Sequence, residues 1–424
     1  MTIELQPGAA SGKLTAAASK SEAHRLLICA ALADKPSWLD LGQPSQDILA
    51  TMRCLEALGA EIEPSGGRYY LIPINRWNDR EPCVMDCGES GSTLRFLMPA
   101  AGALGSEAEV RVSGRLGQRP MEPLVEQLKA HGCRITDPDG VTGGRTIAGQ
   151  LQPGDYRLPG NVSSQFISGL LMALPLLCSD SRLIVEGPLE SAGYIDLTIQ
   201  ALKTFGVTLK EEPDGWTIPG VGYCTPGQVR AGGDWSNAAP WLCMGLLGGD
   251  GMTVLGLDAQ SKQGDKAIVS LLTQMGGQVT QTETEVTVKP GTRQPVTIDA
   301  RQIPDLVPVL AAAAAAIPGK TRIEGAGRLR LKESDRLATT AQMLTALGAQ
   351  VEETEDGLLI QGQRTLSGGV CDAAGDHRIA MAAAVASAAC TGPVTITGAE
   401  AVQKSYPAFW ADLKAVGRVV TEQP

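Results

Sequence analysis

An internal repeat constrains the fold of this 424-residue chain more than any other feature. Six segments share one pattern: a leucine, an apolar residue three positions later, a glycine at the fourth position and an aliphatic residue at the seventh. Their glycines are Gly59, Gly132, Gly206, Gly276, Gly348 and Gly417, and His131 is the one polar departure. Successive glycines lie 69 to 74 residues apart, which is too regular for chance and too long for a solenoid unit of one helix pair.

Each copy predicts a corner at which a helix ends and a strand begins. Glycine readily adopts the left-handed conformation that terminates a helix, and the aliphatic residue after it is expected to start a strand that faces the core. A unit of about 70 residues has room for two helices and about four strands by ordinary element lengths. The chain is therefore expected to contain six such units.

The length and the turn composition predict two domains. A chain of 424 residues is too long for one ordinary core, and a glycine-rich stretch at residues 219–234 resembles a domain crossing. Residues 14–16 resemble a strand that leads into a second crossing at residues 17–19. We therefore predict one domain from residues 18–232 and a discontinuous one from residues 1–17 plus 233–424, each with three units.

Charge and composition limit the partners. The net charge of −10 disfavours nucleic acid and anionic membranes, because an acidic surface repels both. The longest apolar runs, residues 306–317 and 379–390, are shorter than the roughly 20 residues of a membrane helix. The first ten residues show no secretory signal, so a cytoplasmic protein is expected. Without a C-x-x-C pair, and with three histidines, no zinc site can be assembled.

In the N-terminal half, small or charged turns precede apolar helices. These turns are residues 19–25, 86–95, 115–121 and 160–166, and they offer lysine, arginine, serine or glycine where a helix begins. Free N–H groups at a helix start attract anions, and nearby cations add to that attraction. Each turn alone is equally compatible with an ordinary N-terminal cap.

The C-terminal half shows the same arrangement at residues 303–305, 331–336, 375–379 and 403–407. Residues 331–336 place four ionisable side chains in six positions, and on a helix Lys332 and Arg336 would share one face with Glu333 close by. Taken alone, this run is typical of a solvated salt-bridge face. Together with the other turns, it indicates a site for a small polyanion in the cleft between the two halves.

These segments resemble, in identity and order, the motifs of the 5-enolpyruvylshikimate-3-phosphate synthase family. The most specific are Val162-Ser163-Ser164-Gln165-Phe166 and Leu331-Lys332-Glu333-Ser334-Asp335-Arg336. The resemblance spans nearly the whole chain. It implies a mixed α and β fold of two similar domains, each of three β-α-β-α-β-β units, joined by a double hinge with the active site in the cleft.

The resemblance also implies a reaction. The family transfers the enolpyruvyl group of phosphoenolpyruvate to the 5-hydroxyl of shikimate 3-phosphate and releases phosphate, in the pathway to the aromatic amino acids. It is the target family of glyphosate. No metal or organic cofactor is implied, and we expect a monomer.

Site residues follow from the resemblance position by position. For shikimate 3-phosphate they are Lys20, Ser21, Arg25, Ser163, Ser164, Gln165, Ser191, Tyr194, Asp305, Arg328 and Lys332. For phosphoenolpyruvate they are Lys20, Gly91, Arg119, Gln165, Arg336, Arg378 and Lys404. Asp305 is expected to act as the base and Glu333 as the acid, with Lys20 as a possible proton shuttle, because two carboxylates in different environments can divide these roles.

Five positions differ from the family pattern. Residues 89–92 read Glu-Ser-Gly-Ser instead of Asn-Ala-Gly-Thr, and Arg328 and His24 each stand where asparagine is usual. Two alternative functions remain open. The sister class that transfers enolpyruvyl to UDP-N-acetylglucosamine lacks the Val-Ser-Ser-Gln-Phe stretch, and a catalytically silent binding protein would be expected to lack an acid, base or arginine position that is present here.

Overall fold

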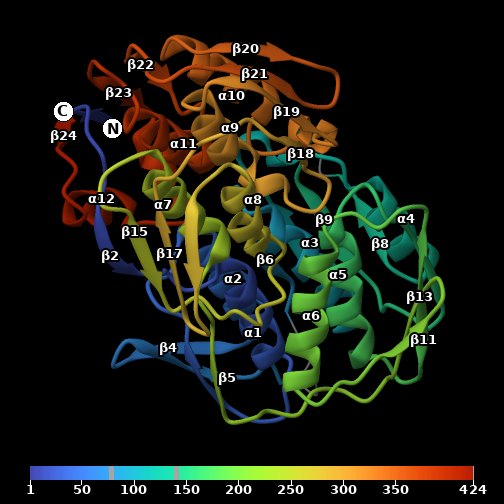
Figure 1. Cartoon of the computed structure of the whole chain (residues 1–424). Coiled ribbons are helices and arrows are strands. Elements are labelled where there is room, and N and C mark those ends of the chain that lie inside the picture. The colour runs from blue at the N-terminus through green and yellow to red at the C-terminus, as the bar shows by residue number, and fades with distance from the viewer. Residues whose placement is uncertain (76–80, 138–142, 424) are drawn as a thin grey trace. The chain divides into compact units, whose positions relative to one another are not determined.

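The computed structural model describes residues 1–75, 81–137 and 143–423 (Figure 1). The chain forms two compact units: residues 18–231 make the N-terminal unit, and residues 1–17 with 232–424 make the C-terminal unit. One division falls between Ala17 and Ala18, and the other between Ala231 and Gly232, one residue before the predicted position. None of the described helices has the length and apolar character that crossing a bilayer requires.

Each unit contains three four-stranded sheets. In the N-terminal unit, the strand orders are β14(Gln228–Arg230)-β3(Ser37–Asp40)-β5(Arg68–Ile72)-β4(Glu61–Ser65), β6(Cys83–Asp86)-β7(Ala108–Arg111)-β9(Arg145–Ala148)-β8(Arg134–Thr136) and β10(Asp155–Pro159)-β11(Ser181–Glu186)-β13(Gly215–Ile218)-β12(Lys210–Glu212). In the C-terminal unit, they are β2(Gly12–Thr15)-β15(Met252–Leu255)-β17(Glu285–Lys289)-β16(Gln278–Gln281), β18(Thr297–Asp299)-β19(Gly319–Glu324)-β21(Leu358–Gly362)-β20(Gln350–Glu353) and β22(Gly369–Asp372)-β23(Val394–Thr397)-β1(Thr2–Leu5)-β24(Val420–Gln423).

All six sheets have the same pairing. The first two strands in each of these orders are parallel, and the remaining neighbours are antiparallel. The C-terminal unit follows the same rule. A parallel pair needs a helical crossover, whereas the antiparallel pair can be joined by a short turn, which gives the β-α-β-α-β-β order. The predicted mixed α and β fold with a six-fold repeat is confirmed.

The N-terminal segment completes two sheets of the C-terminal unit. Strand β1 pairs antiparallel with both β23 and β24, and β2 runs parallel to β15. In Figure 1 the marked N and C termini accordingly lie close to each other, next to β23 and β24. The first sheet of the N-terminal unit is completed in turn by β14, the last strand before the second crossing.

The described part of the chain contains twelve α-helices. They are α1(Lys20–Ala31), α2(Gln46–Ala57), α3(Gly91–Ala103), α4(Glu122–Ala130), α5(Ser164–Ala173), α6(Ala192–Thr204), α7(Trp235–Leu247), α8(Ile268–Gln274), α9(Val307–Ala315), α10(Arg336–Ala346), α11(His377–Ser387) and α12(Phe409–Ala415). In the C-terminal unit, α7, α9 and α11 contact one another and are buried along their whole length. Their own residues are mostly apolar on every face, as expected for a helix buried in a core.

The six repeat glycines end six helices, as predicted. They follow α2, α4, α6, α8, α10 and α12, and their φ angles lie between +82° and +102°. A strand begins within four residues of each glycine. The repeat therefore marks the second helix of each unit and the strand after it.

Two of these glycines allow a matched stability test. A Cβ added at Gly276 would lie 1.9 Å from the carbonyl oxygen of Thr292, whereas one added at Gly417 would meet nothing within 4 Å. We expect Gly417→Ala to lower the free energy of unfolding by about 1–2 kcal/mol, the cost of a left-handed side-chain residue. Gly276→Ala should lower the free energy of unfolding further, because the backbone at Thr292 would also have to move. Equal losses in chemical denaturation would contradict this account.

Candidate functional site

Most of the predicted site residues lie in loops and helix starts that follow the carboxyl ends of parallel strands. The two parallel strands of a sheet end at the same edge, so the loops and helix starts that follow them are neighbours. In the N-terminal unit these segments follow parallel strands of the second and third sheets, whereas α1, which carries Lys20, follows β2 and leads into β3 of the first sheet. In the C-terminal unit they come from the sheets that contain β18 and β22.

At the first sheet, Lys20 opens α1 directly after its N-cap Ser19. Its Nζ lies 2.8 Å from Oδ2 of Asp47, a buried carboxylate in the first turn of α2. This ion pair holds the ammonium group of Lys20 at the start of two helices. The sequence interpretation missed Asp47, because an acid in the first turn of a helix is common and gives no sign of a distant lysine.

Arg25 lies deeper in the same unit and is almost fully buried. Its guanidinium donates to the carbonyl oxygens of Ser21 and Tyr194 and to the hydroxyls of Thr198 and Ser168. Burial lowers the pKa of Arg25 to about 10. These four acceptors belong to α1, α5 and α6, so Arg25 links the three helices. A carboxylate bound at Arg25 would share the guanidinium with them.

At the second sheet, two guanidiniums meet the start of α3. Ser90 caps this helix by accepting from the backbone N–H of Thr93. A Cβ added at Gly91 would lie 2.9 Å from one terminal nitrogen of Arg119 and 3.2 Å from one of Arg95. An added side chain would push the Arg119 guanidinium aside, so glycine leaves room for it here, and the backbone N–H groups and Arg119 can face one anion. The prediction included Gly91 and Arg119 as site residues but not Arg95, which it placed only in the turn at residues 86–95.

At the third sheet, serines stand at the starts of two adjacent helices. Ser163 caps α5, and Ser191 directly precedes α6. The loops that carry them are joined by hydrogen bonds from the Gly160 N–H to the Glu186 carbonyl and from the Glu190 N–H to the Gly160 carbonyl, at 2.9 and 3.1 Å. Ser191 has a φ of +55°, a strained conformation for a residue other than glycine that is frequent at ligand sites.

Ser164, Gln165 and Tyr194 complete this group. Ser164 is buried in the first turn of α5, while Gln165 and Tyr194 are half-buried in the first turns of α5 and α6. Gln165 donates from its amide nitrogen to the Ser92 hydroxyl at 2.9 Å. The serine-bearing helix starts and the arginine-bearing turn are therefore directly connected within the N-terminal unit.

In the C-terminal unit, Arg336 is the centre of a cluster of carboxylates. Its guanidinium is 2% exposed and contacts Asp376, Glu333 and Asp305 at 2.7, 2.7 and 2.8 Å. Lys332 and Arg378 also approach Asp305, at 3.8 and 3.6 Å. The structure thus brings together the predicted residues Asp305, Lys332, Glu333, Arg336 and Arg378.

Residues 331–336 form a charged turn that leads into a helix, as predicted, and not a helix on which Lys332 and Arg336 share one face. Lys332 follows a 3-10 helix at Gly327–Leu331, residues 333–335 are not helical, and α10 begins only at Arg336. Asp335 is the N-cap of α10: it accepts from the Ala338 N–H and pairs with Arg330. The run is therefore the approach to a helix start and not a solvated helix face, because its central arginine is buried among acids.

Burial and charge set the ionisation of this cluster. Burial by itself would raise the pKa of Asp305, but Lys332, Arg378 and Arg336 outweigh it and hold the pKa well below its usual range. Burial likewise opposes the charge on Arg336, whereas Asp376, Glu333 and Asp305 raise its pKa. Burial, and then the charge of Asp305, raises the pKa of Asp265 to about 7. Asp305 is accordingly ionised at neutral pH.

Two further predicted residues stand apart from these contacts. Lys404 is buried at the end of the 3-10 helix Ala399–Lys404 that follows β23. Arg328 is half-buried and donates to the carbonyl oxygen of Arg301 at 2.9 Å. Asp376, which the sequence interpretation treated only as part of a turn, is fully buried and binds Arg336 through both of its oxygens.

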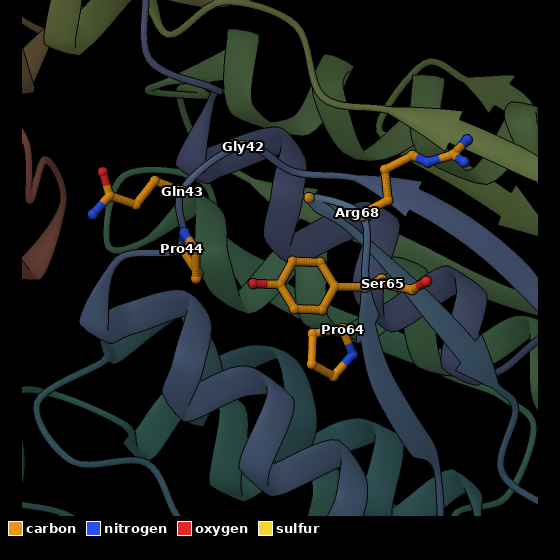
Figure 2. Close-up of a pocket in the computed structure, with 9 residues that line it drawn as sticks. Gly42, Gln43, Pro44, Pro64, Ser65 and Arg68 are labelled. Carbon is orange, nitrogen blue, oxygen red and sulfur yellow. The ribbon is translucent and has the colours of Figure 1, made fainter.

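A hollow of about 440 Å³ on the N-terminal unit lies away from these residues (Figure 2). It is lined by the loop that contains Gly42 and Pro44 and by the β4–β5 turn, from Pro64 to Tyr69. None of the predicted site residues lines it. Arg68 is the one ionisable cation in this lining, which gives the hollow a weaker attraction for a polyanion than the helix starts described above.

Comparison with known proteins shows the family of this chain. A family model described as EPSP synthase (3-phosphoshikimate 1-carboxyvinyltransferase) matches residues 5–413. The chain belongs to the EPSP synthase family. The 3-phosphoshikimate 1-carboxyvinyltransferases of Clostridium kluyveri and Clostridium novyi are 42% and 41% identical to it, over 99% of this chain and 98% of each of theirs.

Solved structures show the same fold. The structure of EPSP synthase from Acinetobacter baumannii matches with a TM-score of 0.83 and 26% identity, over 99% of this chain and 100% of that chain. These comparisons confirm the predicted EPSP synthase family and fold, and they favour that family over the sister class of enolpyruvyl transferases.

Proposed function

We propose that this protein transfers the enolpyruvyl group of phosphoenolpyruvate to the 5-hydroxyl of shikimate 3-phosphate and releases phosphate. The observation that carries the proposal is the pair of connected anion sites in the N-terminal unit. One is lined by serine hydroxyls at two helix starts, the other by Arg119 and the backbone at Gly91, and Gln165 joins the two through its hydrogen bonds to Ser92 and to the buried Arg95. Two substrates that each bear a phosphate and a carboxylate fit this chemistry.

Shikimate 3-phosphate is assigned to the serine-lined site. Ser163, Ser164 and Ser191 would hold its phosphate, because hydroxyls and helix N–H groups converge there. Gln165 and Tyr194 would line the ring, and Ser21 and Arg25 would bind the carboxylate. From the C-terminal unit, Asp305, Arg328 and Lys332 are assigned to the other polar groups of this substrate.

Phosphoenolpyruvate is assigned to the arginine-lined site. Arg119, Gln165, Lys20 and the backbone at Gly91 would contact it from the N-terminal unit, and Arg336, Arg378 and Lys404 from the C-terminal unit. The assigned contacts come from both units, so turnover would depend on residues of each unit. All assigned contacts lie in one chain, so we propose that a cytoplasmic monomer is active.

The addition step requires two proton transfers: a proton reaches the methylene carbon of phosphoenolpyruvate and another leaves the attacking hydroxyl, which gives a tetrahedral intermediate. That intermediate then loses a proton from its new methyl group and expels phosphate, which restores the carbon–carbon double bond in the product. Asp305 is assigned as the base, since it is ionised at neutral pH, and Glu333 as the acid. An anion that engages Lys332, Arg336 and Arg378 would weaken their hold on Asp305 and so increase its affinity for a proton. Lys20 is positioned by Asp47 to shuttle a proton.

Phosphate release from phosphoenolpyruvate tests the proposal. It should require shikimate 3-phosphate and should not occur with UDP-N-acetylglucosamine. Identification of the enolpyruvyl ether product by mass spectrometry would exclude simple hydrolysis of phosphoenolpyruvate. Absence of release with shikimate 3-phosphate, or release with the UDP-sugar instead, would overturn the assignment.

Gly91→Ala should weaken binding of phosphoenolpyruvate. The added methyl group would displace the Arg119 guanidinium, which lies 2.9 Å from the position of that carbon. We expect the KM for phosphoenolpyruvate to rise roughly tenfold, the effect of one lost charge-assisted hydrogen bond. The KM for shikimate 3-phosphate serves as the internal control and should change little. Equal increases in both constants would contradict a local effect at Arg119.

A further inference from the structure

Arg95 is a buried arginine that lies beneath the arginine-lined site. It belongs to the second turn of α3, and it is 4% exposed. One terminal nitrogen donates to the side-chain oxygen of Gln165 at 2.6 Å, and the other donates to the carbonyl oxygen of Pro120 at 3.4 Å. The guanidinium also lies over the ring of Phe166, with its central carbon 5.4 Å from the ring centroid. Arg95 thus links α3 to the start of α5 and to the loop after Arg119.

The first of these contacts fixes the orientation of an amide. A glutamine side chain has an oxygen that accepts and a nitrogen that donates, and the two ends are exchanged by a flip. An arginine can only donate, so it retains the Gln165 oxygen on its own side. The amide nitrogen is then turned away from Arg95, where one of its N–H groups donates to Ser92. Because Arg95 holds the oxygen, the second N–H of the amide also points away from Arg95.

The other contact acts on the neighbouring arginine. Pro120 directly follows Arg119, and its carbonyl oxygen accepts from Arg95. The Arg119 side chain reaches the same turn, because an added Cβ at Gly91 would contact both Arg119 and Arg95. Arg95 therefore bears on two residues that are assigned to phosphoenolpyruvate without being placed in contact with that substrate.

We propose that Arg95 is a positioning residue for phosphoenolpyruvate: it holds the Gln165 amide with N–H groups toward the substrate anion and anchors the backbone beside Arg119. The inference rests on the proposed function, since it presumes that this turn binds phosphoenolpyruvate. An amide in the opposite orientation would present an oxygen to the anion and repel it. In that orientation the amide N–H groups would face the N–H groups of Arg95, two donors without an acceptor, so Arg95 disfavours it.

Arg95→Lys is the direct test, because lysine keeps the buried charge but lacks the planar fork. We expect the KM for phosphoenolpyruvate to rise by about five- to twentyfold, with kcat and the KM for shikimate 3-phosphate within about threefold of wild type. Arg157→Lys is the matched control, since Arg157 is an exposed arginine of β10 in the same unit. Combining Arg95→Lys with Gln165→Met should give less than the product of the two separate effects.

The outcomes separate the inference from the function it rests on. A wild-type protein without phosphate release contradicts the proposed function. An active wild type with an unchanged KM for phosphoenolpyruvate in a folded Arg95→Lys variant overturns the inference alone, as does full additivity with Gln165→Met. If Arg95→Lys does not fold, Gln165→Glu and Gln165→Met decide. A donor-facing amide predicts that Glu raises the KM more than Met, whereas tolerance of Glu would show that position 165 presents an oxygen.

Discussion

Glu333→Gln is expected to lower kcat by about 10²–10⁴-fold, the usual contribution of a general acid. The KM values of both substrates should stay close to those of wild type. Glu333 accepts from Arg336 at 2.7 Å through one oxygen, and the amide oxygen of glutamine can accept in the same way. The substitution therefore retains the hydrogen bond and removes only the transferable proton. Steady-state kinetics with both substrates varied would measure the two effects.

Asp305→Ala should act on the other proton transfer and also lower kcat far more than binding. Asp305 is surrounded by three cations that hold its pKa well below its usual range. Restoration of part of the activity by an added small carboxylate such as formate would support a base at this position. Glu324→Gln is a suitable control, because Glu324 forms a half-exposed pair with Arg322 in the same unit. Wild-type turnover in either site variant would remove the role assigned to that residue.

The repeated part of the fold could be predicted from sequence because it depends on local chemistry. Each repeat glycine has a positive φ at the end of a helix, and only glycine adopts that conformation without strain. The spacing of the glycines then gave the size of the unit. The prediction that residues 14–16 form a strand also relied on a local pattern, and β2 covers Gly12–Thr15.

The site was less predictable because its contacts join residues far apart in the chain. Asp47 pairs with Lys20 across 27 positions, Arg95 with Gln165 across 70 and Asp376 with Arg336 across 40. A sequence shows which residues are charged but not which charges are buried together. At residues 331–336 the i to i+4 spacing of Lys332 and Arg336 does not place them on one helix face, since that spacing predicts a shared face only if the segment is helical and α10 begins at Arg336.

The connected contacts also suggest why the site residues are held before substrate binds. Arg336 is satisfied by three carboxylates and Lys20 by Asp47, so neither cation is buried without compensation. A substrate carboxylate or phosphate would exchange with one of these partners instead of neutralising a bare charge. Such an exchange favours an anion whose shape lets it replace the carboxylate contacts of Arg336 and Lys20. A simple ion would replace fewer of these contacts and would bind more weakly.

Arg336→Met should cause the largest loss of stability. It would leave Asp376, Glu333 and Asp305 together without their shared cation, and breaking a buried ion pair costs about 3–5 kcal/mol. Arg330→Met is the matched control, because Arg330 also contacts two carboxylates, Asp335 and Glu353, but its side chain is 30% exposed. For the exposed pair we expect a loss of about 1 kcal/mol or less.

The deficit of Arg336→Met should also depend on pH. In the wild type the lowered pKa of Asp305 contributes stability that is present above the unfolded value of about 3.9 and is lost as the pH falls through the lower folded value. Between pH 7.5 and 5.5 this contribution is therefore constant. Without Arg336 the pKa values of the clustered acids rise, so protonation relieves their repulsion and the deficit relative to wild type should shrink toward pH 5.5. Urea denaturation at both pH values would measure this change, and a deficit that grows on acidification would contradict the central role of Arg336.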